Sequence, residues 1–199
     1  MDRSRPGQGG DATRLRAGAV KQANRPSRIW LVGLSGSGKS TVARELAALL
    51  DWRVLDSDQE IRNLAGMDIP EIFDVLGEDH FREMERSIAA RAAEACRVVV
   101  ATGGGQMANG CLAEVMLGSG AVVYLRARPR TCASRLATQL GTEGRPMLGG
   151  EGSLTKKLDS LLKRRRPIYE SAHHSLDVDG TEPRRLAINI REMLDADPA

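Results

Sequence analysis

The chain has 199 residues, of which 41% are hydrophobic and 3% aromatic, and its formal net charge is +3. This length and hydrophobic content suit one folded domain with its own core, and so few aromatic side chains argue against a platform that stacks nucleic-acid bases. The charge is uneven, because residues 1–28 hold seven Lys or Arg and two Asp, a net of +5, which leaves −2 for residues 29–199. We therefore expect no nucleic-acid partner for the folded part.

The three cysteines, Cys96, Cys111 and Cys132, form no C-x-x-C pair and are odd in number. This pattern predicts neither a disulfide framework nor a zinc site, and it favours a reducing, cytoplasmic location. No run approaches the roughly 18 apolar residues of a membrane helix, and the N-terminus lacks the apolar centre of a secretory signal. We expect no membrane association.

Residues 1–27 are rich in Gly, Arg, Ser, Gln and Pro and poor in bulky apolar side chains. This composition predicts a disordered basic extension ahead of a folded domain over 28–199. An organelle transit peptide would also be Arg-rich and acid-poor, but no amphipathic helix is evident. A loose nucleic-acid or membrane tether is a further alternative.

Strands and helices alternate through the rest of the chain. Short apolar runs predict strands buried in a parallel sheet, and apolar positions at helical spacing predict helices. The predicted strands are 29–32, 54–55, 98–101, 121–125 and 175–178, and the predicted helices are 40–50, 58–66, 69–75, 79–95, 129–138, 154–164 and 183–194. This order predicts an α/β fold of three layers, a parallel sheet with helices on both faces.

The first strand runs into a glycine-rich turn, residues 33–40, with the sequence GLSGSGKS. It satisfies the P-loop pattern G-x-x-x-x-G-K-[ST], in which backbone N–H groups and the following helix N-terminus surround phosphate oxygens. Lys39 is expected to reach the β- and γ-phosphates, and the Ser40 hydroxyl to bind Mg²⁺. The predicted nucleotide-binding residues here are Gly36, Ser37, Gly38, Lys39, Ser40 and Thr41.

Two aspartates end the second strand, Asp56 and Asp58. Because alternate strand residues face the same side, both carboxylates are expected to project toward the edge where parallel α/β folds bind ligands. One would hold Mg²⁺, which prefers carboxylate and water oxygens, and the other would accept a proton or hydrogen bond from an attacking hydroxyl. Asp58 as a simple helix N-cap is the alternative.

Several further motifs follow in a characteristic order. They are the DSD of 56–58, GMDIPEIF of 66–73, GEDHFREME of 77–85, ATGGG of 101–105, RPML of 145–148 and RRPIY of 165–169. Together with the P-loop, from about Ile29 to the last helix, they resemble the shikimate kinases. The P-loop also resembles those of adenylylsulfate and gluconate kinases, but these would be expected to show DGD where this chain has Ser57.

The resemblance implies a P-loop NTPase fold of the nucleoside-monophosphate-kinase type. It also implies an Mg²⁺-dependent transfer of the γ-phosphate of ATP to the 3-hydroxyl of shikimate, giving shikimate 3-phosphate and ADP. Asp58 would bind the acceptor hydroxyls and could take their proton, and Asp56 with Ser40 would organise the metal. Lys39, Asp58 and Arg145 are the implied catalytic residues.

The acceptor carboxylate would be held by Arg82 and Arg165, whose guanidinium groups pair well with carboxylates. Gly103, Gly104 and Gly105 would let the backbone approach the acceptor ring. Taken alone, Arg82 could form an exposed helix ion pair with Glu85, Arg165 could belong to a solvated basic face, and the glycines could form a plain turn.

Residues 141–152 contain five glycines and Arg145. By resemblance they form a mobile lid, with Arg145 neutralising charge on the transferring phosphoryl group; a plain surface loop is the alternative. Arg135 and Pro183 would border the adenine.

Two other functions remain open at this point: a kinase of another small polyol or acid, such as gluconate, and a catalytically silent nucleotide-binding sensor. A sensor would usually carry a DNA-binding domain, for which residues 1–27 are too short. Catalysis is favoured by the joint presence of Lys39, Asp56, Asp58, Arg145 and Arg165. The expected partners are ATP and shikimate, and a monomer is expected because no apolar helix is left over.

Overall fold

The computed structural model describes residues 26–139 and 151–196. In this part of the chain five parallel strands form one sheet in the order β2-β3-β1-β4-β5. The strands are β1 (Arg28–Val32), β2 (Arg53–Asp56), β3 (Val98–Ala101), β4 (Ala121–Arg126) and β5 (His174–Asp177). The predicted parallel sheet is confirmed, with each strand within two residues of its predicted bounds.

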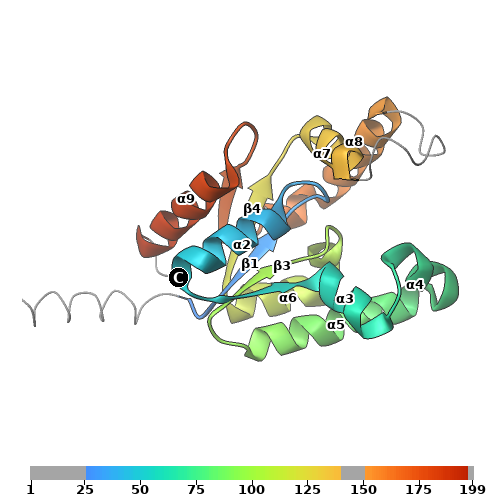
Figure 1. Cartoon of the computed structure of the whole chain (residues 1–199), viewed down its shortest axis with the longest axis horizontal. Helices are drawn as coiled ribbons and strands as arrows, with labels where there is room; N and C mark the ends of the chain where they lie inside the picture. Colours follow the sequence, from blue (N-terminus) through green and yellow to red (C-terminus); the bar gives the residue numbers. More distant parts are fainter. Residues whose placement is uncertain (1–25, 140–150, 197–199) are drawn as a thin grey trace, which may run out of the picture.

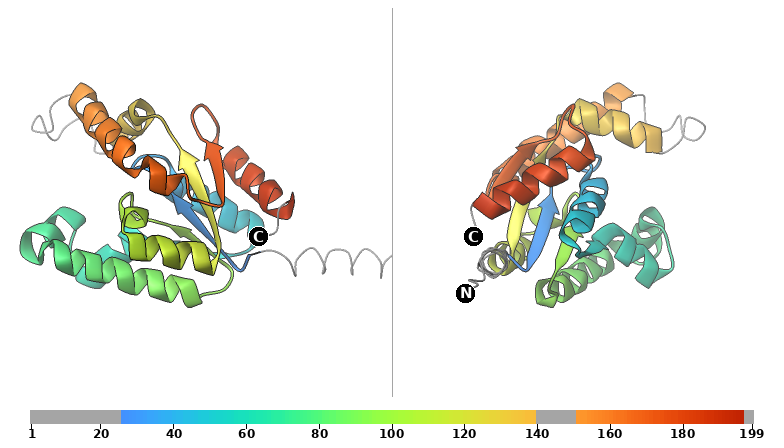
Figure 2. Two further views of the ribbon diagram at one scale, coloured as in Figure 1. Left: turned by 180° about the vertical axis from the view of Figure 1, so that it is seen from behind. Right: turned by 60° about the vertical axis from the view of Figure 1, so that its left-hand side comes forward.

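Helices cover both faces of the sheet, as predicted. They are α2 (Lys39–Leu50), α3 (Ser57–Ala65), α4 (Ile69–Val75), α5 (Gly77–Glu94), α6 (Gly110–Ser119), α7 (Pro129–Gln139), α8 (Glu151–Tyr169) and α9 (Pro183–Ala196), with a short 3-10 helix η1 (Gln106–Ala108). Helices α2 and α9 pack together over one face, and α5 and α6 lie together on the other (Figures 1 and 2). The result is three layers.

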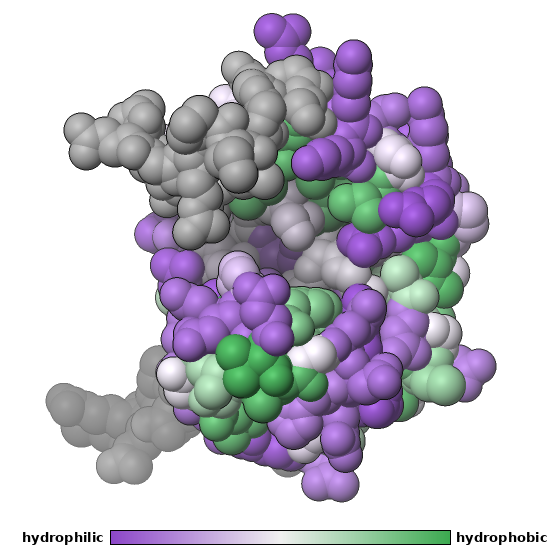
Figure 3. Space-filling view, turned by 90° about the vertical axis from the view of Figure 1, so that its right-hand side faces the viewer, coloured by the Kyte–Doolittle hydropathy of each residue, from purple (hydrophilic) through white to green (hydrophobic). Residues whose placement is uncertain are grey.

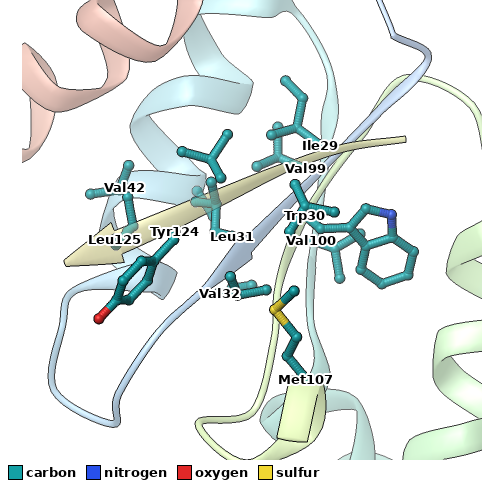
Figure 4. Packing of buried hydrophobic residues seen from close by; sticks show 14 of the residues in the cluster. Ile29, Trp30, Leu31, Val32, Val42, Val99, Val100, Met107, Tyr124 and Leu125 are labelled. Carbon is teal, nitrogen blue, oxygen red and sulfur yellow. The ribbon is translucent and has the colours of Figure 1, made fainter. Parts of the chain in front are cut away.

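The core forms where the central strands are apolar. In β1, β3 and β4 nearly every residue is buried, whereas the edge strands β2 and β5 are partly exposed. Figure 4 shows Trp30 of β1 beside Val100 of the neighbouring strand β3. Strands buried on both faces read as continuous apolar runs, and this rigid core fixes where their carboxyl ends lie.

A smaller cluster joins α3, α4 and α5 beside the main core, built from Ile61, Ile72, Phe81 and Ile88. The rings of Phe73 and Phe81 lie 4.6 Å apart between their centroids. This packing holds α5, and with it the polar residues on the side of α5 that faces the glycines after β3. No helix among the described residues is long and apolar enough to cross a bilayer.

Two elements, η1 and α6, were not predicted from the sequence. Helix α6 begins at Gly110 and ends at Ser119 next to Gly120. Its buried residues Leu112, Ala113 and Met116 share one face, but Cys111 and Val115 on the exposed side are apolar as well, so the sequence shows only weak periodicity. Helix α8 is longer than the predicted 154–164 and continues through Pro167, a residue that usually ends helices but here lies in the last turn.

Candidate active site

A cavity of about 760 Å³ opens at the carboxyl end of the sheet, where parallel α/β folds bind ligands. Figure 3 looks onto this end and shows a hollow with hydrophilic residues at its floor. The predicted residues that line the cavity are Gly36, Ser37, Gly38, Lys39, Ser40, Thr41, Asp56, Asp58, Gly104, Arg135 and Pro183. Segments far apart in sequence therefore meet here as predicted.

The P-loop curls between β1 and α2 because glycine occupies its turning points. Gly36 has a φ of 80°, and a Cβ on it would lie 2.6 Å from the carbonyl oxygen of Cys132 in α7. The loop thus needs glycine here both for its backbone conformation and for the close approach of α7. The amino end of α2, at Lys39, follows directly, so its backbone N–H groups point into the cavity.

Lys39 is almost fully buried beneath this loop, with 7% of its surface exposed. Its Nζ donates hydrogen bonds to the carbonyl oxygens of Gly33 at 3.0 Å and Leu34 at 2.8 Å. Burial lowers the pKa of Lys39 from 10.5 to about 8, although the nearby Asp58 carboxylate opposes the shift. A buried ammonium of this kind is well placed to neutralise phosphate charge.

The two aspartates reach the cavity by a different route from the one predicted. Strand β2 ends at Asp56, and α3 begins at Ser57, so Asp58 lies in the first turn of a helix. The expected strand alternation is therefore wrong, and so is the alternative of Asp58 as N-cap. Asp56 is the cap: its Oδ1 accepts a hydrogen bond from the backbone N–H of Gln59 at 3.2 Å.

Both carboxylates nevertheless face the P-loop. Burial raises the pKa of Asp58 above its usual value, and the charge of Lys39 limits the rise. Asp56, Asp58 and the Ser40 hydroxyl line the same cavity and supply the hard oxygen donors that Mg²⁺ prefers. The residues present thus fit a magnesium site next to bound phosphates.

The three glycines after β3 lie in close contact with other parts of the chain. A Cβ on Gly103 would lie 2.8 Å from Oδ1 of Asp58, and one on Gly104 would lie 2.8 Å from the backbone nitrogen of Ser35. A Cβ on Gly105 would lie 3.2 Å from Nη2 of Arg165. Residues 103–105, the glycine turn, therefore touch three other parts of the site.

Arg82 and Glu85 form an ion pair of 2.7 Å one turn apart on α5, and Glu85 is only 2% exposed. The exposed surface pair considered from the sequence is therefore wrong for Glu85. Arg82 also pairs with Glu78 at 2.9 Å. Burial raises the pKa of Glu85, and the hydrogen bond from Arg82 opposes the rise. Two flanking carboxylates hold the Arg82 guanidinium in one place.

Gln106 is a site residue that the sequence analysis did not identify. It is fully buried, accepts a hydrogen bond from the backbone N–H of Gly103 at 3.2 Å, and donates one to the Glu85 carbonyl at 3.3 Å. It thus ties the glycine turn to α5. Only its position directly after the glycines could have drawn attention to it.

The far wall of the cavity comes from α7 and the start of α9. Nη1 of Arg135 donates to the Ser37 carbonyl oxygen at 3.0 Å, and Pro183 lines the same wall. The structure adds residues that the sequence did not single out: Thr102, Ser134, Thr138 and the turn 180–182. Ordinary loop and helix residues such as these carry no local signal for a nucleotide.

Three predicted site residues, Gly103, Gly105 and Arg165, lie next to the cavity but do not line it. Gly103 contacts Asp58, Gly105 lies against Arg165, and Arg165 donates to the Gly104 carbonyl oxygen at 3.0 Å. Arg82 reaches this region through Glu85, whose Oε1 would lie 3.3 Å from a Cβ on Gly103. Arg145 and residues 141–150 of the predicted lid lie outside the described residues, and residues 151–152 belong to α8.

Comparison with known proteins agrees with this geometry. A sequence model of the shikimate kinase family matches residues 35–195. The shikimate kinase of Moorella thermoacetica is 39% identical over 86% of this chain and 96% of its own. A solved shikimate kinase from Acinetobacter baumannii in complex with shikimate is 35% identical, with a TM-score of 0.78 over 88% of this chain and 97% of its own.

A solved gluconokinase from Sinorhizobium meliloti has a TM-score of 0.54 at 22% identity, over 86% of this chain and 94% of its own. That likeness is one of fold. The family match, the sequence relatives and the solved shikimate kinase agree with one another, and this chain belongs to the shikimate kinase family.

Proposed function

We propose that this chain transfers the γ-phosphate of ATP to the 3-hydroxyl of shikimate, the reaction of its family. The position of Asp58 is the observation that carries this proposal. Its carboxylate lines the same cavity as Lys39 of the P-loop and lies against Gly103 of the glycine turn. A hydroxyl bound there would be next to both a proton acceptor and the phosphate site.

The acceptor would lie over the glycine turn with its carboxylate toward the two arginines. Arg82 is held by Glu78 and Glu85, and Arg165 is held by Gly104. Two fixed guanidinium groups form charge-assisted hydrogen bonds with a carboxylate. Because Gly103 and Gly104 have no side chains, the ring hydroxyls can approach Asp58 closely.

The nucleotide would bind with its phosphates in the P-loop and its base near Arg135 and Pro183. Phosphoryl transfer relies mostly on positioning and on neutralising charge. Lys39 would exchange its bonds to the loop carbonyls for bonds to phosphate oxygens. Arg145 is proposed to add positive charge to the transferring group.

Ser40 and Asp56 are the residues proposed to hold Mg²⁺. When bound there, the metal would neutralise part of the negative charge of the phosphates. Asp56 uses Oδ1 to cap α3, so a metal contact through Oδ2 would leave the cap intact.

The first test is ADP release by the purified chain with Mg-ATP, comparing shikimate, gluconate, adenylylsulfate and no acceptor. Stimulation by shikimate alone is the expected result. Stimulation by gluconate or adenylylsulfate instead would reassign Arg82 and Arg165. Nucleotide binding without stimulation by any of the three would support a sensor instead of an enzyme.

Asp58→Asn tests the role of the central carboxylate. Because the amide keeps the size of the side chain but cannot take a proton, kcat should fall about 10²- to 10⁴-fold. The Kd for ATP, measured by calorimetry, should change by less than about threefold. If Asp58→Asn kept near-normal turnover, the role proposed for Asp58 would be wrong.

We further propose that the chain acts as a monomer in the cytoplasm. Cys96 and Cys111 are exposed free thiols, which suits a reducing compartment. Sedimentation of the full chain at micromolar concentration would detect a dimer if this is wrong.

A further inference from the structure

The last turn of α8 carries a buried tyrosine beside the glycine turn. Tyr169 is 1% exposed, and its ring stacks on Tyr124 of β4 with 5.1 Å between the centroids. Arg165 precedes it by four residues, so both side chains lie on one face of the helix. The aromatic stack fixes the phenol on the wall of the core.

The Tyr169 hydroxyl and the Arg165 side chain share one hydrogen-bond acceptor. The hydroxyl donates to the carbonyl oxygen of Gly104 at 2.5 Å, and Nη1 of Arg165 donates to the same oxygen at 3.0 Å. The phenol thus fixes the carbonyl group that holds the arginine, a long side chain that would otherwise sample several rotamers.

This network reaches the cavity through Gly104. Its α-carbon lies so close to the P-loop that a Cβ would be 2.8 Å from the nitrogen of Ser35, and Gly104 lines the cavity wall. One phenol therefore links the end of α8 to the glycine turn. Tyr169 itself does not line the cavity.

We propose that Tyr169 is a positioning residue for the acceptor, because its hydroxyl fixes the Gly104 carbonyl that holds the Arg165 guanidinium in the orientation that receives the acceptor carboxylate. This inference rests on the proposed function. Without the hydroxyl, the Gly104 carbonyl and the Arg165 guanidinium bonded to it would have to be ordered when the acceptor binds, and the entropy cost would appear as weaker binding. The phosphate site and Asp58 do not depend on it.

Tyr169→Phe removes the hydroxyl and keeps the aromatic stack. The KM for shikimate should rise about tenfold, near the upper end of what the loss of one hydrogen bond produces, while kcat stays within about twofold and the KM for ATP does not change. Tyr124→Phe is the matched control, because the Tyr124 hydroxyl makes no hydrogen bond with any described residue. It should leave both KM values unchanged.

A double-mutant cycle with Arg165→Lys separates positioning from general stability. If Tyr169 acts through Arg165, adding Tyr169→Phe to Arg165→Lys should raise the KM for shikimate by less than about twofold. The proposal would be overturned if the two substitutions had fully additive effects on the KM for shikimate. It would also be overturned if Tyr169→Phe lowered kcat, raised both KM values by similar factors and lowered Tm. If the unmodified chain shows no shikimate-dependent ADP release, the proposed function itself has failed.

Discussion

At the scale of one residue, Lys39 shows that a buried charge suited to binding phosphate lowers the stability of the fold. The lysine is buried and charged at neutral pH, and its pKa of about 8 lies below the 10.5 of an exposed lysine. The folded state therefore binds this proton less tightly than the unfolded state does. Keeping the charge in place lowers the free energy of unfolding at every pH below about 8.

We expect Lys39→Met to be more stable than the unmodified chain and nearly inactive. The gain at pH 7 is at most about 3 kcal/mol from the pKa shift, reduced by the lost bonds to Gly33 and Leu34. A net gain of about 1 kcal/mol raises Tm by roughly 2–4 °C. Turnover should fall at least about 100-fold.

The sign of the pH dependence provides a control for this variant. Between about pH 8 and 10.5 the folded chain loses the proton of Lys39 before the unfolded chain does, so its stability relative to the methionine variant rises with pH. Chemical denaturation should show that the difference in free energy of unfolding between Lys39→Met and the unmodified chain is smaller at pH 9.5 than at pH 7. If Lys39→Met were less stable than the unmodified chain at pH 7, the claim that the buried charge of Lys39 lowers stability would be contradicted.

At the scale of the element, α3 depends on Asp56 for its cap while the proposed metal site depends on the same carboxylate. Asn and Asp cap helices about equally well, whereas Ala does not. Asp56→Asn should therefore keep its Tm within about 2 °C but need more Mg²⁺ for half-maximal turnover.

Asp56→Ala should show the same magnesium defect and also lose about 1 kcal/mol of stability. Thermal melts and magnesium titrations of the two variants separate the roles. If the asparagine variant required no more Mg²⁺ than the unmodified chain, Asp56 would be a cap only.

The contact between the glycine turn and the P-loop also belongs to this scale. In Gly104→Ala the new methyl group would meet the backbone of Ser35 at 2.8 Å, and a backbone cannot move aside as a flexible side chain does. We expect turnover to fall about 100-fold or more, as a misplacement near 1 Å does.

Gly118→Ala in α6 is the matched control, since nothing lies within 4 Å of its added methyl group. It should keep full turnover and gain about 0.5–1 kcal/mol in stability. Steady-state rates and thermal melts of both variants test this prediction. If Gly104→Ala kept its activity, the close contact between Gly104 and Ser35 would not be needed for turnover.

At the scale of the whole molecule, composition separates residues 1–27 from the rest of the chain, because they are rich in Gly, Arg, Ser, Gln and Pro and poor in bulky apolar side chains. We propose that residues 28–199 form the folded domain and that the basic extension adds nothing to its stability. Removing residues 1–24 should leave Tm within about 1 °C and kcat within about twofold.

A deletion through Leu31 is the contrasting variant, because it removes a central strand with the buried residues Ile29, Trp30 and Leu31. It should not fold, as judged by circular dichroism. A large drop in Tm on removing 1–24 alone would show that the extension packs on the domain.

Much of this protein was predictable from local patterns. Apolar runs identified the buried strands β1, β3 and β4, and the spacing of GLSGSGKS identified the phosphate loop, because both depend on backbone conformation and neighbouring residues. The motif order identified the family. Helix α6 escaped because its apolar residues have no strong helical period, and the strand alternation expected for Asp58 failed because α3 starts one residue earlier.

What only the tertiary structure decided is which distant groups meet. Gln106 joins Gly103 to Glu85, and Tyr169 joins Arg165 to Gly104, over separations of up to 65 residues. Burial then changes the chemistry of Lys39, Asp58 and Glu85. Sequence alone determined the elements and the phosphate loop, because these follow from neighbouring residues; the environment of each charge depends on packing between elements, which no local pattern encodes.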